Sequence, residues 1–596
     1  MAFNNIPQMF YSQAQKNSGK VAQKAKRGGR WIDISWNEME QNVRETAHGL
    51  LSLGMNKGDT VSLLSVSRAE WVQCDLGIQS AGGITVPIYQ SNTPDQAEYI
   101  INNSASRFVI VENKNQLDKV LSVRNKLTNV RNIIIIEGST DSKEGVLTLD
   151  ELKKKGREQA KNFEKIVSDT IAGIKRDDIA TIVYTSGTTG PPKGVIQTHG
   201  NHLAMSEALM KVTYNEMGDV SLLFLPLAHS FARAAEYFDI YQGQTTAFAE
   251  SIEKVVDNLG EVKPHYMASV PRVFEKAYAT ILSNATGTPL KKKIFEWAVK
   301  VGRQASQLIQ AKKPIPIGLQ LKRAIAHKLV FSKIHKRFGG NLRFLVSGGA
   351  PLSKEIAEFF HAAGILILEG YGLTETCPAT HMNRYEDYQF GTVGPALPLV
   401  DVKIAPDGEI LVKGPNICFR GYFKRPEETK ELFTEDGWLR TGDIGEIDSR
   451  GFLKITDRKK DLIKTAGGKY VAPQNIENLL KVDPFISQAV VIGDRRPYCV
   501  ALISISQPEA EKFAKDNGIS YSSYEDLTKN EKIFNRVKQT VDKMNSRQAS
   551  FETIKKFYIV PRDFTQENDE MTPTLKIKRK VVTERYKGPI DRLYVK

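Results

Sequence analysis

Short apolar runs alternate with amphipathic stretches through roughly the first two thirds of the chain. Residues 60–64, 108–111 and 133–136 are runs of this kind, short enough to be buried strands. Strands separated by helices usually pair in parallel, because the chain has to cross over the sheet before the next strand begins. The alternation therefore predicts an α/β fold with mostly parallel sheets.

The clearest strand–helix unit contains two glycine clusters. A predicted strand at residues 342–346 leads into a Gly-Gly-Ala turn at 348–350, and apolar residues at helical spacing follow. A second predicted strand at residues 365–368 leads into the run Gly-Tyr-Gly at 370–372. Ligands of open α/β sheets bind beyond the carboxyl ends of the strands. We therefore expect both glycine clusters to lie at a ligand site.

The pattern changes in the last third of the chain, where short strands are joined by tight turns. Residues 408–412 and 452–455 are examples. Five charged residues at 457–461 then precede a compact α+β pattern. A charged run of this kind is typical of an exposed linker, so we predict two domains, residues 1–457 and residues 458–596.

The run Tyr-Thr-Ser-Gly-Thr-Thr-Gly-Pro-Pro-Lys-Gly at residues 184–194 follows an apolar strand at 179–183. Its glycines allow backbone N–H groups to approach a ligand, and its hydroxyls and lysine supply further donors, which suits a polyphosphate. The spacing is neither that of a Walker A loop nor that of a dinucleotide fingerprint. A flexible surface loop is the alternative. The position after a strand and the embedded lysine favour the phosphate loop.

This run resembles the signature T-S-G-T-T-G-x-P-K-G of the adenylate-forming superfamily, which includes acyl-CoA synthetases, beetle luciferases and peptide-synthetase adenylation domains. The resemblance implies a large N-terminal domain of mostly parallel sheets with a distorted β-barrel subdomain, and a small, mobile α+β C-terminal domain. It also implies an ATP site at the loop, formed by Thr185, Ser186, Gly187, Thr188, Thr189, Gly190 and Lys193.

Later runs resemble the other nucleotide-binding motifs of this superfamily. The resemblance implies that Tyr371 stacks on adenine, that Thr374 approaches the α-phosphate and that Glu375 binds Mg²⁺, for which a carboxylate is a preferred ligand. Asp443 would accept hydrogen bonds from both ribose hydroxyls, and Arg458 would contact ribose or phosphate. The remaining predicted nucleotide contacts are Gly348, Gly349, Ala350 and Gly372.

Two lysines near the C-terminus compete for one predicted role. The resemblance places the hinge between the domains at Lys460 and the catalytic lysine in the motif T-x-x-G-K-x-x-R, aligned on Thr572 and Lys576. Leu575 stands where the motif has glycine, and Lys578 is only two residues away, so it is the alternative. Together with Lys576, the residues Thr188, Lys193 and Glu375 are the predicted catalytic set.

Runs at residues 83–89, 225–233 and 269–276 resemble the long-chain fatty acyl-CoA synthetase branch. That resemblance implies a fatty acid–CoA ligase with ATP and coenzyme A as co-substrates, which forms acyl-AMP and pyrophosphate and then acyl-CoA and AMP. His229 matches a gating position beside the acyl site, although a core histidine that caps a strand is an equally good interpretation. Gly467 and Gly468 match a loop that approaches the pantetheine tunnel.

The net charge of +15 requires an anionic partner, and much of the excess lies in residues 290–337. Apolar residues alternate there with thirteen Lys or Arg and one Glu. A surface that lies on an anionic membrane and an ordinary pair of helices with a solvated basic face are both open interpretations. Without a signal peptide or a membrane-spanning run, we expect a cytoplasmic protein, in contact with the inner face of the membrane under the first interpretation.

Three other functions remain to be weighed. A fatty acyl-AMP ligase would pass the acyl group to a carrier protein, and a pseudo-enzyme would bind nucleotide without turnover. The intact motif residues argue against the pseudo-enzyme. A nucleic-acid-binding protein, which charge alone would suggest, is disfavoured because no base-reading module is recognised.

The four cysteines are far apart in the chain, as expected of buried thiols in a reducing compartment.

Overall fold

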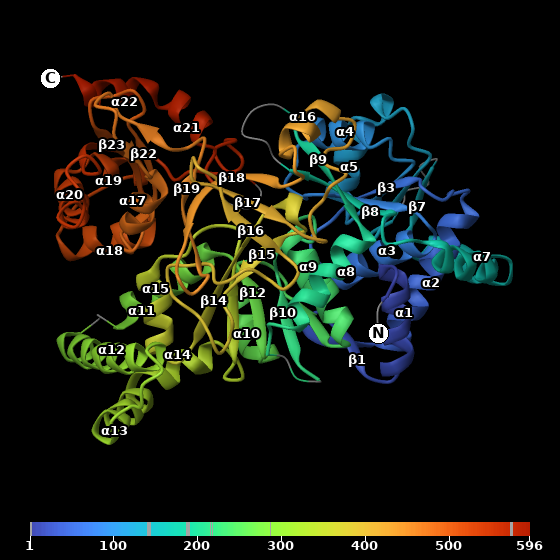
Figure 1. Cartoon of the computed structure of the whole chain (residues 1–596), viewed down its shortest axis with the longest axis horizontal. Helices are drawn as coiled ribbons and strands as arrows, with labels where there is room; N and C mark the ends of the chain where they lie inside the picture. Colours follow the sequence, from blue (N-terminus) through green and yellow to red (C-terminus); the bar gives the residue numbers. More distant parts are fainter. Residues whose placement is uncertain are drawn as a thin grey trace.

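The computed structural model describes residues 3–139, 145–185, 191–214, 216, 218–285, 288–572 and 576–595. Two large sheets form most of the N-terminal part (Figure 1). The first sheet has eight strands in the order β15 (Ala379–Met382), β14 (Leu366–Gly372), β13 (Phe344–Ser347), β12 (Tyr266–Ser269), β10 (Val220–Leu223), β11 (Thr245–Phe248), β1 (Val21–Arg27) and β2 (Arg30–Ser35). The second has seven, in the order β7 (Val146–Thr148), β6 (Asn132–Ile135), β5 (Phe108–Val111), β3 (Thr60–Leu64), β4 (Ile84–Ile88), β8 (Ile179–Thr185) and β9 (Lys193–Thr198).

The pairing confirms the predicted mostly parallel α/β sheets. All neighbours in both sheets are parallel except the edge pairs β1–β2, β14–β15 and β8–β9. Strands β3 and β5 have the predicted bounds, and β6 begins one residue early. Strand β14 continues beyond the predicted end at residue 368 because residues 370–372 pair with β15.

Helices cover these sheets and connect their strands. Those of the N-terminal part are α1 (Ile6–Asn17), α2 (Trp36–Ser52), α3 (Ala69–Ser80), α4 (Pro94–Asn103), α5 (Lys114–Ser122), α6 (Leu149–Glu158), α7 (Ala160–Gly173), α8 (His199–Met210), α9 (Ser230–Gln242), α10 (Val255–Val262), α11 (Pro271–Ala285), α12 (Pro289–Gln310), α13 (Ile317–Ala326), α14 (Ser332–Arg337), α15 (Lys354–Ala362) and α16 (Pro426–Leu432). In the described ranges, no helix has the length and apolar character needed to cross a bilayer.

An antiparallel sheet corresponds to the predicted β-rich subdomain. Its strands are β16 (Asp401–Ile404), β17 (Glu409–Lys413), β18 (Leu439–Ile447) and β19 (Leu453–Arg458). Strand β19 runs to Arg458, one residue beyond the predicted end of the first domain, because Arg458 is paired with Asp443 of β18. The first part of the charged run at 457–461 is therefore strand rather than linker.

The C-terminal part is a small α+β unit with its own apolar core, as predicted (Figure 1, orange to red). A short hairpin, β20 (Ile463–Lys464) and β21 (Tyr470–Val471), precedes a three-stranded sheet of β22 (Ile486–Ile492), β23 (Cys499–Ile505) and β24 (Ile554–Ile559). Its helices are α17 (Pro473–Leu480), α18 (Gln507–Asp516), α19 (Tyr524–Lys529), α20 (Glu531–Asn545), α21 (Arg579–Arg585) and α22 (Lys587–Tyr594).

A buried ion pair connects the two large sheets. Arg233 of α9 contacts Asp75 of α3 at 2.7 Å, and each side chain is 1% exposed. The same guanidinium donates to Thr181 of β8 at 2.5 Å and to the Tyr237 hydroxyl at 2.7 Å. Helix α9 connects β10 to β11 in the eight-stranded sheet, whereas α3 and β8 belong to the seven-stranded sheet with its helices. The pair therefore fixes the position of one sheet against the other.

We expect Asp75→Ala to lower the free energy of unfolding of the N-terminal part by about 3–5 kcal/mol, because it leaves a buried guanidinium without its counter-ion. The measurement is the shift of the denaturant midpoint. As a matched control, Asp118→Ala removes the exposed pair that Lys114 and Asp118 form at 3.2 Å, and should cost less than about 1 kcal/mol. Equal losses in the two variants would show that the buried pair has no special weight.

Candidate functional site

A cavity of about 2110 Å³ lies between the N-terminal sheets, the β16–β19 sheet and the C-terminal part. It brings together residues that are up to about 500 positions apart in the chain, which is the separation of Tyr89 and Asp591. The predicted site residues on its wall are Thr185, Lys193, His229, Gly348, Gly349, Ala350, Tyr371, Gly372, Thr374, Glu375, Asp443, Arg458, Lys460 and Lys576. The predicted loop residues Ser186, Gly187, Thr188, Thr189 and Gly190 lie outside the described residues.

The base of the loop at 186–192 is held by two paired strands. Thr185 at the end of β8 pairs with Lys193 at the start of β9. The Lys193 ammonium lies 5.0 Å from the centroid of the Tyr422 ring, and the Tyr422 hydroxyl donates to Oε1 of Glu375 at 2.7 Å. Tyr422 thus connects the loop lysine to the predicted metal ligand. Sequence reasoning missed it, because it lies in no recognised motif.

Three glycines on the cavity wall stand where a side chain would be strained or would come too close to its neighbours. Gly349 has φ of +82°, in the left-handed region that favours glycine. A Cβ atom at Gly372 would lie 1.7 Å from the carbonyl oxygen of Pro378, closer than any side chain permits. At Gly348 a Cβ atom would lie 3.1 Å from the Phe231 ring. The turns therefore keep backbone exposed toward the cavity.

A carboxylate and two partners form the next part of the wall. Asp443 of β18 lies directly opposite Arg458 of β19, and Oδ1 of Asp443 lies 3.3 Å from Nε of Arg458. The Tyr371 hydroxyl donates to Oδ2 of Asp443 at 2.7 Å. Burial raises the pKa of Asp443, and the charge of Arg458 opposes that rise. The predicted stacking of Tyr371 on adenine stays a prediction.

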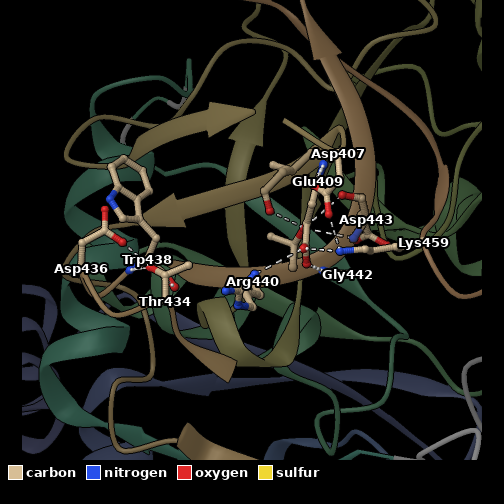
Figure 2. A network of polar contacts seen from close by, with 11 residues as sticks. Asp407, Glu409, Thr434, Asp436, Trp438, Arg440, Gly442, Asp443 and Lys459 are labelled. Carbon is tan, nitrogen blue, oxygen red and sulfur yellow. Dashed lines mark hydrogen bonds and ion pairs between the residues drawn. The ribbon is translucent and has the colours of Figure 1, made fainter. Parts of the chain in front are cut away.

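Close to Asp443, a second network holds the chain that leads to the C-terminal part. Figure 2 shows Lys459 pointing toward Asp407 and Glu409, and its ammonium lies 2.7 Å and 2.9 Å from their carboxylates. Glu409 is 4% exposed and also accepts a hydrogen bond from the Gly442 amide at 3.0 Å. The residue that precedes Lys460 is thus anchored to the N-terminal part.

Lys576 and Lys578 have different surroundings. Lys576 lies where the charges of Arg458, Asp443 and Glu375 act on it, and burial lowers its pKa to about 8. A tight turn places it: its amide donates to Oγ1 of Thr572 at 3.0 Å. Lys578 lies at the edge of the same cavity, and its ammonium is bonded to Asp569. The geometry favours Lys576 as the lysine that acts in the cavity.

His229 begins α9 at the cavity wall. Its Nδ1 accepts a hydrogen bond from the Phe231 amide at 3.1 Å, so the ring caps a helix rather than a strand. Burial and the charge of Lys576 lower its pKa to about 3, so the ring is neutral at physiological pH. The wall of the same cavity also has apolar side chains, among them Met205, Leu209, Phe224, Phe238, Ile252 and Val270. The gating role of His229 stays a prediction.

Two predicted residues lie apart from this cavity. Gly467 and Gly468 are in the exposed turn between β20 and β21 and are not part of the wall.

Conversely, the buried carboxylate of Glu369 on β14 lines the cavity, and sequence reasoning missed it. Its Oε2 accepts from the Leu352 amide at 3.2 Å, and burial raises its pKa to about 7. Its position directly before the Gly-Tyr-Gly run was the available signal.

Comparison with known proteins gives matches over the whole chain. Family models of the AMP-binding enzyme and of the AMP-binding enzyme C-terminal domain match residues 10–423 and 460–596. The chain is 36% identical to the long-chain-fatty-acid–CoA ligase FadD15 of Mycobacterium tuberculosis, covering 100% of this chain and 97% of that protein. It is 33% identical to the peroxisomal long chain acyl-CoA synthetase 7 of Arabidopsis thaliana, covering 95% and 82%.

Solved structures show the same fold. The anthranilate CoA ligase AuaEII in complex with anthranoyl-AMP superposes with a TM-score of 0.74 at 20% identity, covering 99% of each chain. The Mycobacterium tuberculosis fatty acyl CoA synthetase superposes with a TM-score of 0.61 at 22% identity, covering 98% of this chain and 99% of that one.

The environment of Lys576 predicts an unusual reactivity. Only a neutral amine is acylated, so trace labelling with acetic anhydride should reach half of its maximal rate at Lys576 near pH 8, measured by mass spectrometry of the peptide. Asp443→Asn should move this midpoint lower, because the carboxylate favours the charged amine. A midpoint near the roughly 10.4 of a free lysine would contradict the buried position.

Proposed function

The chain belongs to the AMP-binding enzyme family, and we propose that it is a long-chain fatty acid–CoA ligase. The acid would react with ATP to give acyl-AMP and pyrophosphate, and coenzyme A would then displace AMP to give acyl-CoA. The observation that carries the proposal is that the base of the predicted phosphate loop, Glu375, Asp443 and Lys576 line the same cavity as a set of apolar side chains. The apolar part of the wall suits an alkyl chain, and the polar part suits a nucleotide.

The polar end offers a place for each part of ATP. We assign the β- and γ-phosphates to the loop at 186–190 and to Lys193, and the ribose hydroxyls to Asp443 with Arg458 beside it. Adenine would lie against the backbone of Gly348, Gly349 and Ala350 and against the Tyr371 ring, and Thr374 would face the α-phosphate.

Glu375 fits the role of a Mg²⁺ ligand. Its Oε1 is held by the Tyr422 hydroxyl, and among the described residues its Oε2 accepts no hydrogen bond. A carboxylate oriented by one neighbour and open on its other oxygen suits a hard cation that also binds phosphate. When bound, the ion would offset the negative charge of the phosphates. Tyr422 would keep the carboxylate directed toward them.

Lys576 would act on the first half-reaction. When the carboxylate of the fatty acid attacks the α-phosphorus, negative charge develops on the oxygens around that phosphorus and on the departing pyrophosphate. A protonated lysine aimed at this region stabilises that charge without reorganising solvent. With a pKa of about 8, Lys576 is mostly protonated at neutral pH, and bound polyphosphate would raise that pKa further.

The second half-reaction would need Lys576 to leave. Lys459 is fixed to Asp407 and Glu409, and we propose the residue that follows it, Lys460, as the hinge. Rotation there would move the chain that follows residue 460, which is nearly all of the predicted C-terminal domain at 458–596, relative to the predicted N-terminal domain at 1–457. This movement would open a path for coenzyme A. Gly467 and Gly468 lie just after the hinge, and their contact with coenzyme A belongs to that second arrangement.

The proposed setting is the cytoplasm, with a peripheral contact at the inner face of an anionic membrane through the basic segment at residues 290–337. Long-chain fatty acids partition into bilayers, so an enzyme that takes them up benefits from lying at the membrane surface.

The test is the formation of AMP and acyl-CoA from ATP, Mg²⁺ and coenzyme A with acids from acetate to long chains. We expect long chains to react best, and Lys576→Ala to lower acyl-AMP formation by about 10²–10³-fold, whereas the matched variant Lys578→Ala stays near the wild-type rate. AMP formation without thioester would instead indicate a ligase that serves a carrier protein. Inactivity with every acid would indicate a nucleotide-binding pseudo-enzyme.

The hinge makes a separate prediction. Lys460→Pro fixes φ near −65° and should lower acyl-CoA formation by about tenfold or more while acyl-AMP formation, followed by exchange of pyrophosphate into ATP, continues. Lys460→Ala removes the same charge without the restriction and should retain both steps. If the proline variant carries out both steps normally, the pivot lies elsewhere.

A further inference from the structure

Four consecutive helical segments extend from the body of the protein and are here called the basic arm, residues 289–337. They are α12, α13, a π-helical segment at His327–Phe331 and α14. One face of α12 packs on α15 through Phe295, Ala298 and Val301, and α13 packs on α12. Figure 1 shows α12 and α13 extending outward from the N-terminal part, with α13 farthest from the rest of the chain.

The outer face of α13 is apolar. Ile317, Leu321 and Ile325 are spaced four residues apart, so they form one stripe along the helix, and they are 85%, 65% and 45% exposed. Ala326 faces the opposite way and is buried. Leu329 continues the exposed stripe, and Leu290, Ile294 and Trp297 form a second exposed stripe on α12. Exposed apolar residues grouped in this way are typical of a binding surface rather than of scattered surface positions.

The charge of the arm is almost entirely uncompensated. It has thirteen Lys or Arg and one acidic residue, Glu296. Twelve of the thirteen basic side chains are exposed. In the part of the chain that the structure describes, only two of the thirteen have a carboxylate within 4 Å: Lys292, which is 4.0 Å from Glu296, and Lys312, which is 3.3 Å from Asp387. The arm therefore accounts for most of the net charge of +15.

We propose that the basic arm docks on an anionic phospholipid bilayer. The apolar stripe of α13 would enter the boundary between headgroups and acyl chains, and the lysines beside it would lie at the anionic headgroups. Long basic side chains on an amphipathic helix are suited to this, since their stems lie along apolar surface while the ammonium stays at the headgroup level. This proposal rests on the proposed function in one respect: the docking would serve to collect a fatty acid that has partitioned into the membrane.

Other occupants fit the arm less well. A second copy of the chain would bring two surfaces of the same charge together, which opposes association. Nucleic acid would use the lysines and arginines, but it would leave the exposed stripe of Ile317, Leu321 and Ile325 in water. A bilayer is the partner that takes up both the charge and the apolar stripe.

The first experiment measures cosedimentation of the full chain with vesicles of phosphatidylcholine alone and with vesicles in which about a third of the lipid is phosphatidylglycerol. We expect binding to the anionic vesicles and little to the neutral ones. Neutralising Lys313, Lys322 and Lys328 to Gln should lower the partition coefficient by about a hundredfold, at about fivefold per charge. The matched control neutralises Lys155, Lys161 and Lys165 on α6 and α7, exposed lysines of the second sheet's helices, and should leave binding unchanged.

The apolar stripe is tested in the same way. The pair Ile317→Ser and Leu321→Ser should weaken binding to anionic vesicles by about tenfold or more, because both side chains lose their apolar contact with the bilayer. Ile166→Ser on α7, 47% exposed in the wild type, is the control. Helix α7 lies at the opposite end of the molecule from α13 (Figure 1).

Absence of binding to anionic vesicles overturns the proposal, and so does an equal loss in the two lysine sets, which would mean that only net charge matters. Retention on DNA without vesicle binding would assign the arm to nucleic acid.

Turnover of a detergent-dispersed fatty acid is measured in parallel. Arm variants should retain that turnover and lose turnover of acid supplied in anionic vesicles. If the wild-type protein turns over neither the detergent-dispersed acid nor the acid in vesicles, this result would count against the proposed ligase. Vesicle binding is measured independently of catalysis.

Discussion

The buried contact between Arg233 and Asp75 is the interaction on which the arrangement of the N-terminal part depends. Burying two charges is costly unless further hydrogen bonds support the pair, and here Thr181 and Tyr237 supply three of them. Arg233 lies one helical turn after His229 at the start of α9, and Thr181 lies on the strand that leads into the phosphate loop. By fixing the two sheets against each other, the pair also fixes the wall with His229 relative to the base of that loop.

The site itself is held together by opposite charges from both domains. Lys576 is brought close to Arg458 and Lys460, which disfavour its charge, and to Asp443 and Glu375, which favour it. Because of this balance of charges, we expect bound ATP to affect how the C-terminal part lies against the N-terminal part. Under the proposed function, a bound polyphosphate would add negative charge beside these cations, and the departure of pyrophosphate would remove much of it. The repulsion among the cations would then favour the proposed rotation of the C-terminal part. The anchored Lys459 confines the rotation to the chain that follows it.

The basic arm shows a different use of charge. Within the cavity Arg458 and Lys576 lie near Asp443, whereas most ammonium and guanidinium groups of the arm have no carboxylate of a described residue within 4 Å. An arrangement of this kind costs stability through self-repulsion, and the exposed stripe on α13 adds apolar surface in contact with water. Both costs are offset when an anionic, partly apolar surface is adjacent. The structure thus separates the nucleotide site from the surface that we assign to lipid.

The amino-acid sequence by itself determined the features that depend on neighbouring residues. Short apolar runs specified strands such as β3 and β5 to the residue, and the glycine clusters after β13 and in β14 marked the edge where ligands bind, because turns and strands have local sequence signals. The motif residues of the nucleotide site were predicted by resemblance, and most of those that the structure describes line one cavity.

Tertiary structure alone decided the contacts between distant parts of the chain. It joined Tyr422 to Glu375 and paired Arg233 with Asp75, and neither contact has a local signal. It also buried Glu369 beside the cavity. It also placed Lys576 among the charges of the cavity and Lys578 against Asp569, whereas the sequence favoured Lys576 and left Lys578 as the alternative. The reason is physical: burial and electrostatic environment depend on which chain segments pack together, and a side chain acquires them only when the fold is complete.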